Sequence, residues 1–281
     1  MPAVTSKTLP YVLTLPSAIV FFATFIAPFI YFFVISFWIV DFFELTPALT
    51  LVNYREIYEK YVPIAIYTVT LSTATAILTL IIGFVYAFIA RFKLPRWADA
   101  LLFIVLITMF GGYLMKIYAW KTILGNEGVL NSALIASGII DTPISVLLYS
   151  RGAVIVTLLH FGLPFAVLPI YAAMRGIKDI ELEVARDLGA SPLETLSTII
   201  VPRCRAGLVT AFSFSFLITV GDYVTPLLVG GKMTLIGNLI APQFGTMFNW
   251  PLGSAMSFVM LAASVLVIWL FSRAMAWWCR I

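Results

Sequence analysis

Residues 183–202 read Glu-Val-Ala-Arg-Asp-Leu-Gly-Ala-Ser-Pro-Leu-Glu-Thr-Leu-Ser-Thr-Ile-Ile-Val-Pro and form a polar stretch between long apolar runs. Their pattern, together with the residues just before them, predicts two short helices. Asp179 can cap a first helix that runs to about Leu188. Gly189 then ends this helix, because glycine readily adopts the left-handed conformation that follows many helix C-termini. We therefore expect the polar stretch to be folded rather than a loose loop.

The second helix of this stretch has a full set of start signals. Ser191 is a good N-cap, Pro192 occupies the first helical position, and Glu194 completes a capping box at the third. Pro202 is expected to end the helix. Capping chemistry alone favours an ordinary amphipathic helix that lies in the membrane interface without a partner, because such patterns are common.

The composition is that of a membrane protein. Hydrophobic residues make up 62% of the chain and charged residues 11%, against about 25% charged residues in soluble domains. A helix needs about 20 apolar residues to cross a bilayer. We predict an all-α membrane protein with one domain, residues 1–281, and six spans at about 11–40, 63–90, 98–121, 151–174, 204–228 and 252–275.

Helix-breaking residues and polar segments add local detail to this prediction. Shorter helices are expected outside the spans at about 53–61 and 128–138. Proline removes a backbone donor and clashes with the preceding turn, and glycine weakens a helix. Kinks, late starts or interruptions are therefore expected at Pro16, Pro28, Gly111-Gly112, Pro164 and Pro169.

The distribution of basic residues predicts the orientation. With a cytoplasmic N-terminus, the cytoplasmic segments hold eleven of the 17 Lys and Arg residues, including Lys7 and Arg280, and the other side holds six. This positive-inside bias, with an even number of spans, places both termini and the loop at about 175–202 in the cytoplasm. The net charge of +4 is therefore a matter of topology and does not indicate nucleic-acid binding.

Several kinds of active site are excluded by the sequence. It contains no Gly-Lys-Ser/Thr phosphate-binding loop, no catalytic triad and no metal-ligand spacing. Cys204 and Cys279 both fall on the predicted cytoplasmic side, where a disulfide is not expected. We therefore predict that the chain is not an enzyme, needs no cofactor, binds no metal and leaves ATP hydrolysis to a partner chain.

The polar stretch resembles the EAA loop of permeases from bacterial ABC importers. It has that loop's spacing, Glu183-x-Ala185-x-x-x-Gly189 followed by Ile199-x-Val201-Pro202. Val184 replaces the second alanine of the pattern and Val201 replaces its usual leucine. The segments 118–131, 221–231 and 236–240 further resemble the spermidine/putrescine permeases, in particular the PotB-like subfamily. This group also serves opines and other small organic cations or amino-acid derivatives.

The resemblance implies a type I importer permease of the MetI-like fold, in the bacterial inner membrane. Such a permease pairs with a second, homologous permease, two ATP-binding subunits and a periplasmic substrate-binding protein. The EAA loop would be the ATPase-coupling site, with Glu183, Ala185, Gly189, Ser191 and Pro192 as its key residues. Small side chains allow close approach to a partner, and Glu183 can form a charge-assisted bond to a basic residue.

Four residues are candidates for a path of a cationic substrate. Asp222 is the acidic residue deepest in an apolar run, where an ionised carboxylate must face protein or water; it can attract a cation, or cap a helix or bond to a neighbouring helix. Tyr118, Trp120 and Tyr223 can form an aromatic wall for an ammonium group. The aromatic belt at the membrane interface accounts for most Trp and Tyr residues at such depths and is the stronger interpretation of these three.

Three further basic side chains, Lys116, Lys121 and His160, lie in or near the predicted spans. Lys116 and Lys121 are expected to snorkel or to lie at the outer surface. His160 lies inside the fourth predicted span, where it can relay protons or bond to a neighbouring helix, the commoner case. An ion-coupled secondary transporter would need titratable groups at the midplane of broken helices, and the sequence offers only His160 there. A membrane enzyme would need a nucleophile or a metal constellation, and the sequence shows neither.

Overall fold

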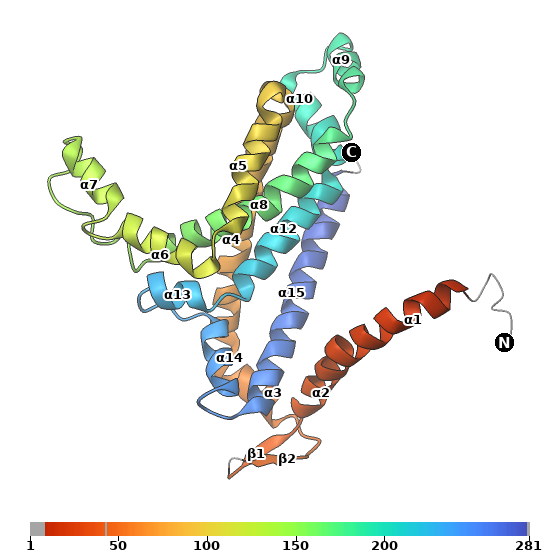
Figure 1. Cartoon of the computed structure of the whole chain (residues 1–281), viewed down its shortest axis with the longest axis vertical. Coiled ribbons are helices and arrows are strands. Elements are labelled where there is room, and N and C mark those ends of the chain that lie inside the picture. The colour runs from red at the N-terminus through yellow and green to blue at the C-terminus, as the bar shows by residue number, and fades with distance from the viewer. Residues whose placement is uncertain (1–8, 43, 280–281) are drawn as a thin grey trace. The chain divides into compact units, whose positions relative to one another are not determined.

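The computed structural model describes residues 9–42 and 44–279, so Lys7 and Arg280 lie outside the described part. Within it, the regular secondary structure is helical apart from one short hairpin (Figure 1). Four helices are long and apolar enough to cross a membrane, or six if each of two bent helix pairs counts as one span. The chain divides into two compact units, residues 1–62 with 240–260 and residues 63–239 with 261–281.

The first unit begins with one long apolar helix. Helix α1 (Leu9–Phe21) continues through a π-helical turn (Phe22–Ile26) into α2 (Ala27–Ile35), so the predicted first span is continuous through Pro16 and Pro28. Most of its described side chains are exposed. Near its end, Phe29 and Phe33 each pack edge-to-face on Phe258, with ring centroids 5.0 Å apart.

A hairpin follows that the sequence prediction missed. Strands β1 (Ile39–Asp41) and β2 (Glu44–Thr46) pair antiparallel, with Ile39 opposite Thr46. Asn53 then ties the chain back to the end of α2. Its side-chain amide donates to the backbone oxygens of Ser36 and Trp38, at 2.9 and 2.8 Å.

The predicted separate helix at 53–61 proves to be part of the next span. Helix α3 (Val52–Glu56) runs through a π-helical turn (Ile57–Tyr61) into α4 (Val62–Phe88) and ends after a further such turn at Lys93. The result is one helix of 42 residues. Pro63 does not break it, because the wider π-helical turn just before it changes the backbone hydrogen bonding around the missing donor.

The same association recurs at every π-helical turn of the described residues. The four turns end at Ile26, Tyr61, Lys93 and Ile200, and in each case a proline stands two residues further on, at Pro28, Pro63, Pro95 and Pro202. Three of these prolines are passed without the helix ending. Pro164 and Pro169 inside α8 have no such turn, so each described π-helical turn precedes a proline but not every proline has one.

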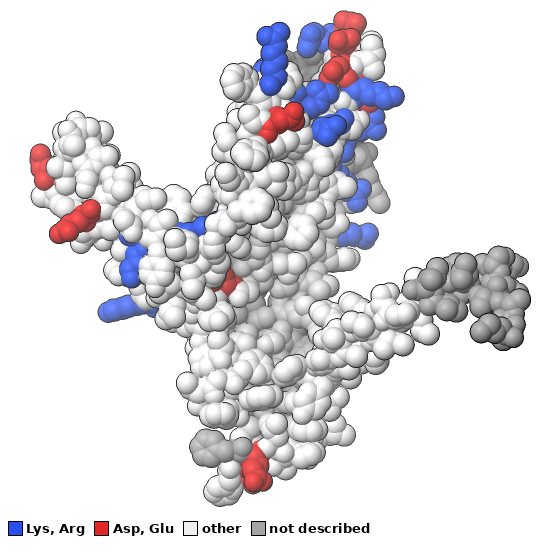
Figure 2. All heavy atoms as spheres, in the orientation of Figure 1, with Lys and Arg blue, Asp and Glu red and all other residues white. Residues whose placement is uncertain are grey.

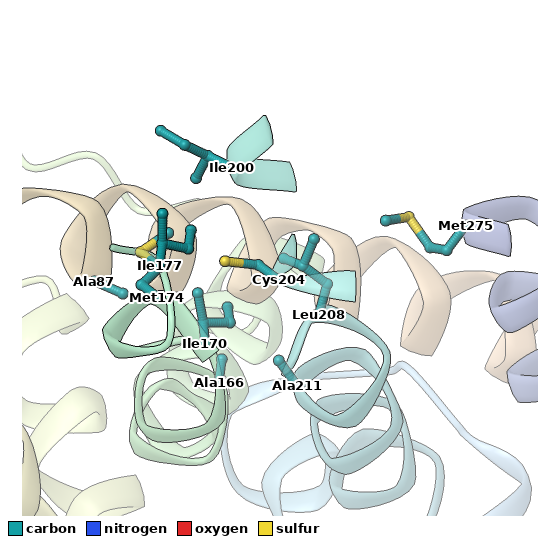
Figure 3. Close-up of a cluster of buried hydrophobic side chains, with 10 residues drawn as sticks. All are labelled: Ala87, Ala166, Ile170, Met174, Ile177, Ile200, Cys204, Leu208, Ala211 and Met275. Carbon is teal, nitrogen blue, oxygen red and sulfur yellow. The ribbon is translucent and has the colours of Figure 1, made fainter. Parts of the chain in front are cut away.

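The second unit is a bundle of apolar helices (Figure 1). Its long members are α4, α5 (Ala98–Phe110), α8 (Arg151–Arg175), α12 (Arg205–Val220) and the last part of α15 (Trp250–Trp278). The predicted fourth span corresponds to α8, which is uninterrupted through Pro164 and Pro169. A buried cluster joins α4, α8, α12 and α15 (Figure 3): Ala87, Ala166, Ile170, Met174, Ile177, Ile200, Cys204, Leu208, Ala211 and Met275.

Two predicted spans turn sharply in this unit. The helix pair on either side of Gly111-Gly112 is bent by 101°, so α6 (Tyr113–Leu124) leaves the direction of α5 and leads to α7 (Val129–Ala136). The helix is interrupted at Gly111-Gly112 as predicted, but the sharp change of direction was not predicted. The predicted fifth span ends at Val220 rather than near 228, and α13 (Val224–Val229) and α14 (Ile236–Phe244) follow.

Helices α8 and α12 approach closely because Gly207 has no side chain. A Cβ at this position would lie 2.6 Å from the backbone oxygen of Pro169 and 2.9 Å from the Cβ of Ala173. We expect Gly207→Ala to destabilise the protein by about 1–3 kcal/mol through overpacking. The thermal stability of the detergent-solubilised protein measures this. Gly152→Ala is the control, because the nearest heavy atom there is 3.6 Å away, and equal stability of the two variants would contradict the prediction.

Candidate functional site

The predicted loop at about 175–202 folds into the two helices expected. Helix α9 covers Asp179–Asp187, and its N-cap is Lys178 rather than Asp179. Asp179 instead occupies the first turn, where negative charge suits the positive end of a helix, and its carboxylate accepts a bond from Arg91 at 2.8 Å. The prediction of Asp179 as the cap was therefore wrong by one residue, because Arg91 holds the carboxylate.

The signals between the two helices are confirmed. Gly189 has a φ of +84° and follows the end of α9. The Ser191 hydroxyl accepts from the Glu194 N–H at 3.3 Å, and the Glu194 carboxylate accepts from the Ser191 N–H at 2.7 Å. This second bond lowers the pKa of Glu194. The Glu194 carboxylate is therefore ionised at neutral pH, and the capping box is intact. Pro192 opens α10 (Pro192–Thr195) as predicted.

Pro202 does not end the second helix. The chain continues from α10 through a π-helical turn (Leu196–Ile200) into α11 (Val201–Arg203). The break comes at Cys204, where the chain bends by 71° into α12. Cys204 is fully buried in the cluster of Figure 3, so the bend is fixed by packing in the core.

One face of α9 carries an apolar ridge, which we define as Ile180, Val184 and Leu188. Ile180 and Val184 are four apart and share one face of α9, and Leu188, four residues further on, is the C-cap whose N–H donates to the Val184 carbonyl. Their side chains are 57%, 48% and 82% exposed, although their neighbours along the loop are charged. Leu193 in α10 is also exposed.

The residues assigned to coupling by resemblance lie on different sides of these helices. Glu183 and Gly189 are exposed, whereas Ala185 is buried. Ala185 therefore packs within the protein and is not on the surface a partner would meet. Ser191 and Pro192 form the capped start of α10. The apolar ridge was missed by the sequence prediction, although its spacing could have been read from the sequence.

A cavity opens beside this loop. It has a volume of about 860 Å³, and residues from the end of α4 and from α9 and α10 line it, among them Arg91, Glu183, Arg186 and Leu193. Figure 2 shows blue and red side chains gathered over the end of the bundle where α9 and α10 lie. The end of the bundle at α9 thus combines many charges, a cavity and an apolar ridge.

A second cavity lies beside Asp222. Its volume is about 540 Å³, and it is lined by Tyr113, Leu114, Phe161, Leu217, Ile218, Gly221, Asp222, Tyr223 and Val224. Two of the predicted path residues, Asp222 and Tyr223, are therefore brought together here. The cavity wall is mostly apolar, with aromatic rings from α6, α8 and the turn after α12.

Asp222 itself is buried and is held by four donors. One carboxylate oxygen accepts from the N–H groups of Val224 and Thr225 at 2.9 and 3.1 Å, and from the Tyr113 hydroxyl at 2.5 Å. The other accepts from the Thr225 hydroxyl. Asp222 thus caps the start of α13 and links it to α6, which were the two structural roles left open by the sequence.

The predicted aromatic wall does not form. Tyr118 is exposed on α6, and Trp120 donates from its indole N–H to the Nδ1 of His160 at 3.1 Å. Neither lines the cavity beside Asp222, where Tyr223 stands with Tyr113 and Phe161 instead. His160 has the expected role of a hydrogen-bonding partner for a neighbouring helix.

Lys116 differs from the prediction of a snorkelling or surface residue. Its side chain is buried, and its ammonium lies 4.8 Å from the centroid of the Phe161 ring. Attraction between a cation and an aromatic face accounts for this position. The sequence could not reveal it, because Lys116 and Phe161 belong to helices on either side of a long connection.

A family described as binding-protein-dependent transport system inner membrane component matches residues 83–278. The spermidine/putrescine transport system permease protein PotB of Haemophilus influenzae is 34% identical over 228 residues, which are 80% of this chain and 79% of that protein. PotB of Escherichia coli is 34% identical over 230 residues, with 80% of this chain and 83% of that protein covered.

Solved structures give a likeness in fold. The crystal structure of a bacterial ABC transporter involved in the import of the acidic polysaccharide alginate matches with a TM-score of 0.75. The match covers 95% of both chains at 17% sequence identity. At this identity the match concerns the arrangement of helices and not the substrate.

Proposed function

The chain belongs to the family of binding-protein-dependent transport system inner membrane components, and we propose that it is the permease subunit of an ATP-driven polyamine importer. In the proposed complex it pairs with a second permease, two ATP-binding subunits and a periplasmic binding protein. ATP binding would close the ATP-binding subunits and rock the two permeases, which would open the path alternately to the two sides. Each state must be favoured by differential contacts with ATP or with the loaded binding protein.

The observation that carries the proposal is the apolar ridge on α9. Three exposed apolar side chains on a helix surrounded by charges are unfavourable in water. They are well suited to a groove on a partner protein, because apolar anchors with a charged rim are the usual anatomy of an interface. We assign this surface to the ATP-binding subunit, with Glu183 at its rim.

The proposed substrate class follows from relatives that carry the name spermidine/putrescine permease. The cavity beside Asp222 supports it, because the faces of Tyr113, Phe161 and Tyr223 offer contacts to an alkylammonium group. We propose that this cavity is the part of the substrate path that this subunit contributes. Asp222 would act there mainly by holding α6 and α13 in place.

The proposed topology has six spans with both termini in the cytoplasm. The two bent helix pairs count as one span each, which agrees with the upper count of six. The loop with α9 and α10 then faces the cytoplasm. The start of α8 at Arg151 lies at the opposite end of a helix of 25 residues, about 37 Å away at 1.5 Å per residue.

Purification of the complex from detergent-solubilised membranes tests this proposal. We expect two permeases and two ATP-binding subunits to purify together, and their ATP hydrolysis to rise when the binding protein is added with spermidine or putrescine. ATP hydrolysis that does not respond to either polyamine would support the importer function but contradict the proposed substrate. Purification without any ATP-hydrolysing chain would reject the coupling role of α9.

A further inference from the structure

Two ion pairs hold the first turn of α9, and one of them comes from α11. The Arg203 guanidinium donates to both carboxylate oxygens of Glu181, with distances of 2.6 and 2.7 Å from Nη2 and 3.0 Å from Nε. A paired geometry of this kind fixes direction as well as distance. The hydrogen bond from Arg203 lowers the pKa of Glu181, so the pair is ionised at neutral pH.

The other ion pair comes from the π-helical turn Ile89–Lys93 that continues α4. Arg91 donates from Nη2 to Asp179 at 2.8 Å and to the backbone oxygen of Ile177 at 3.2 Å. Its side chain is 21% exposed and lies over the ring of Phe92. Arg91 is therefore held by packing as well as by its two acceptors.

The two acidic residues point to different sides of α9. Asp179 and Glu181 are two positions apart, which is about 200° around a helix of 3.6 residues per turn. The first turn of α9 is thus bound on one side by the π-helical turn after α4 and on the other side by α11. We call Arg91–Asp179 and Arg203–Glu181 together the double brace.

The double brace is connected to the cavity beside Asp222 through helix α12. Arg203 is the last residue before the bend at Cys204, and that bend is packed in the core, where Leu208 and Ala211 of α12 also lie (Figure 3). The far end of α12 supplies Leu217 and Ile218 to the cavity wall. A displacement of α9 that moves Arg203 would therefore act through the buried bend at Cys204 on α12, whose far end lies at the cavity.

The brace contributes little to stability. Exposed ion pairs stabilise by about 0–1 kcal/mol, and Arg203 is 57% exposed in its pair. Two separate segments each place an arginine on the same turn of α9, and this arrangement is more specific than so small a stabilisation would explain. Resting on the function proposed above, we propose that Arg91 and Arg203 are positioning residues that transmit movement of α9 to α4 and to α12.

The test measures whether movement of α9 reaches the cavity, and it does not require the substrate to be known. Leu217→Cys, made together with Cys279→Ser, places a thiol in the cavity wall of the purified full complex. The rate of its labelling by a water-soluble maleimide is compared with and without a non-hydrolysable ATP analogue. In the same background, Arg203→Ala and Glu181→Ala are compared with the exchanged pair Arg203→Glu with Glu181→Arg.

We expect the analogue to change the labelling rate in the parent complex. Each single substitution should reduce that change by about threefold or more, which matches an ion pair of modest strength, and the exchanged pair should restore it. The amount of co-purified ATP-binding subunit should stay the same in all variants. Arg55→Ala is the matched control, because Arg55 also pairs with a carboxylate, Glu59, at 2.8 Å on an exposed helix face.

Each other outcome contradicts a specific statement. Single variants with an unchanged response would show that Arg203 transmits nothing. Loss of the ATP-binding subunit from the Arg203→Ala complex would make the pair a docking element and overturn transmission. Single variants that fail and an exchanged pair that fails equally would reject the ion pair as the cause. A parent complex without any response to the analogue would overturn both the brace and the proposed alternating access.

Discussion

Leu188→Lys is expected to weaken the binding of the ATP-binding subunit by about ten- to a hundredfold. The side chain of Leu188 is 82% exposed at the end of the apolar ridge, and burial of a leucine in an interface stabilises by about 1.5–3 kcal/mol. The permease itself should stay folded, because a positive charge near the C-terminus of a helix is favourable. The ratio of ATP-binding subunit to permease after purification measures the effect.

A matched surface substitution separates docking from general effects of charge. Leu49→Lys is suitable, since Leu49 is 95% exposed in the segment between the hairpin and α3. It should leave the subunit ratio unchanged. If Leu188→Lys retained the ATP-binding subunit as well as Leu49→Lys does, the apolar ridge would not be the docking surface, and Leu193 or the cavity beside α9 would be the next candidates.

Asp222→Ala is expected to destabilise the protein by roughly 3–5 kcal/mol. The substitution leaves four donors without their acceptor, among them the hydroxyls of Tyr113 and Thr225. Each buried donor left unsatisfied costs about 1–3 kcal/mol, and partial relaxation reduces the sum. Heating of the detergent-solubilised protein, followed by size-exclusion chromatography, measures the loss. Tyr113→Phe removes only one donor and should cost about 1 kcal/mol.

Asp222→Asn separates the charge of Asp222 from its capping role. The amide keeps one acceptor oxygen for the start of α13, so this variant should be more stable than Asp222→Ala. Because four donors already occupy the carboxylate, we expect the variant to retain most of the spermidine uptake. Loss of uptake by a stably folded Asp222→Asn protein would mean that the carboxylate contacts the cation directly.

The sequence predicted those features that depend on neighbours along the chain. The stop at Gly189 and the capping box of Ser191 and Glu194 are such features, and the structure confirms them. The interruption at Gly111-Gly112 is another. In each case a conformational preference or a hydrogen bond within a few residues is sufficient.

Features that join distant segments could not be predicted in this way. Arg203 and Glu181 are 22 positions apart, and Tyr113 and Asp222 are 109 apart. No local periodicity indicates such pairs. The direction of the bend of 101° after α5 was likewise not predicted, because two glycines indicate an interruption but not an angle. The apolar ridge is an intermediate case, because its spacing was visible although its exposure was not.

The π-helical turns before the prolines have a consequence for how these helices tolerate changes in length. An added residue in a regular helix rotates everything after it by about 100°, which would turn every later side chain away from its partner. A turn that holds one residue more absorbs that rotation locally. The turn Leu196–Ile200 lies directly before Arg203 and Cys204. Single-residue deletions that accompany loss of Pro202 should therefore be tolerated in this helix, whereas deletions in the regular turns of α8 should not.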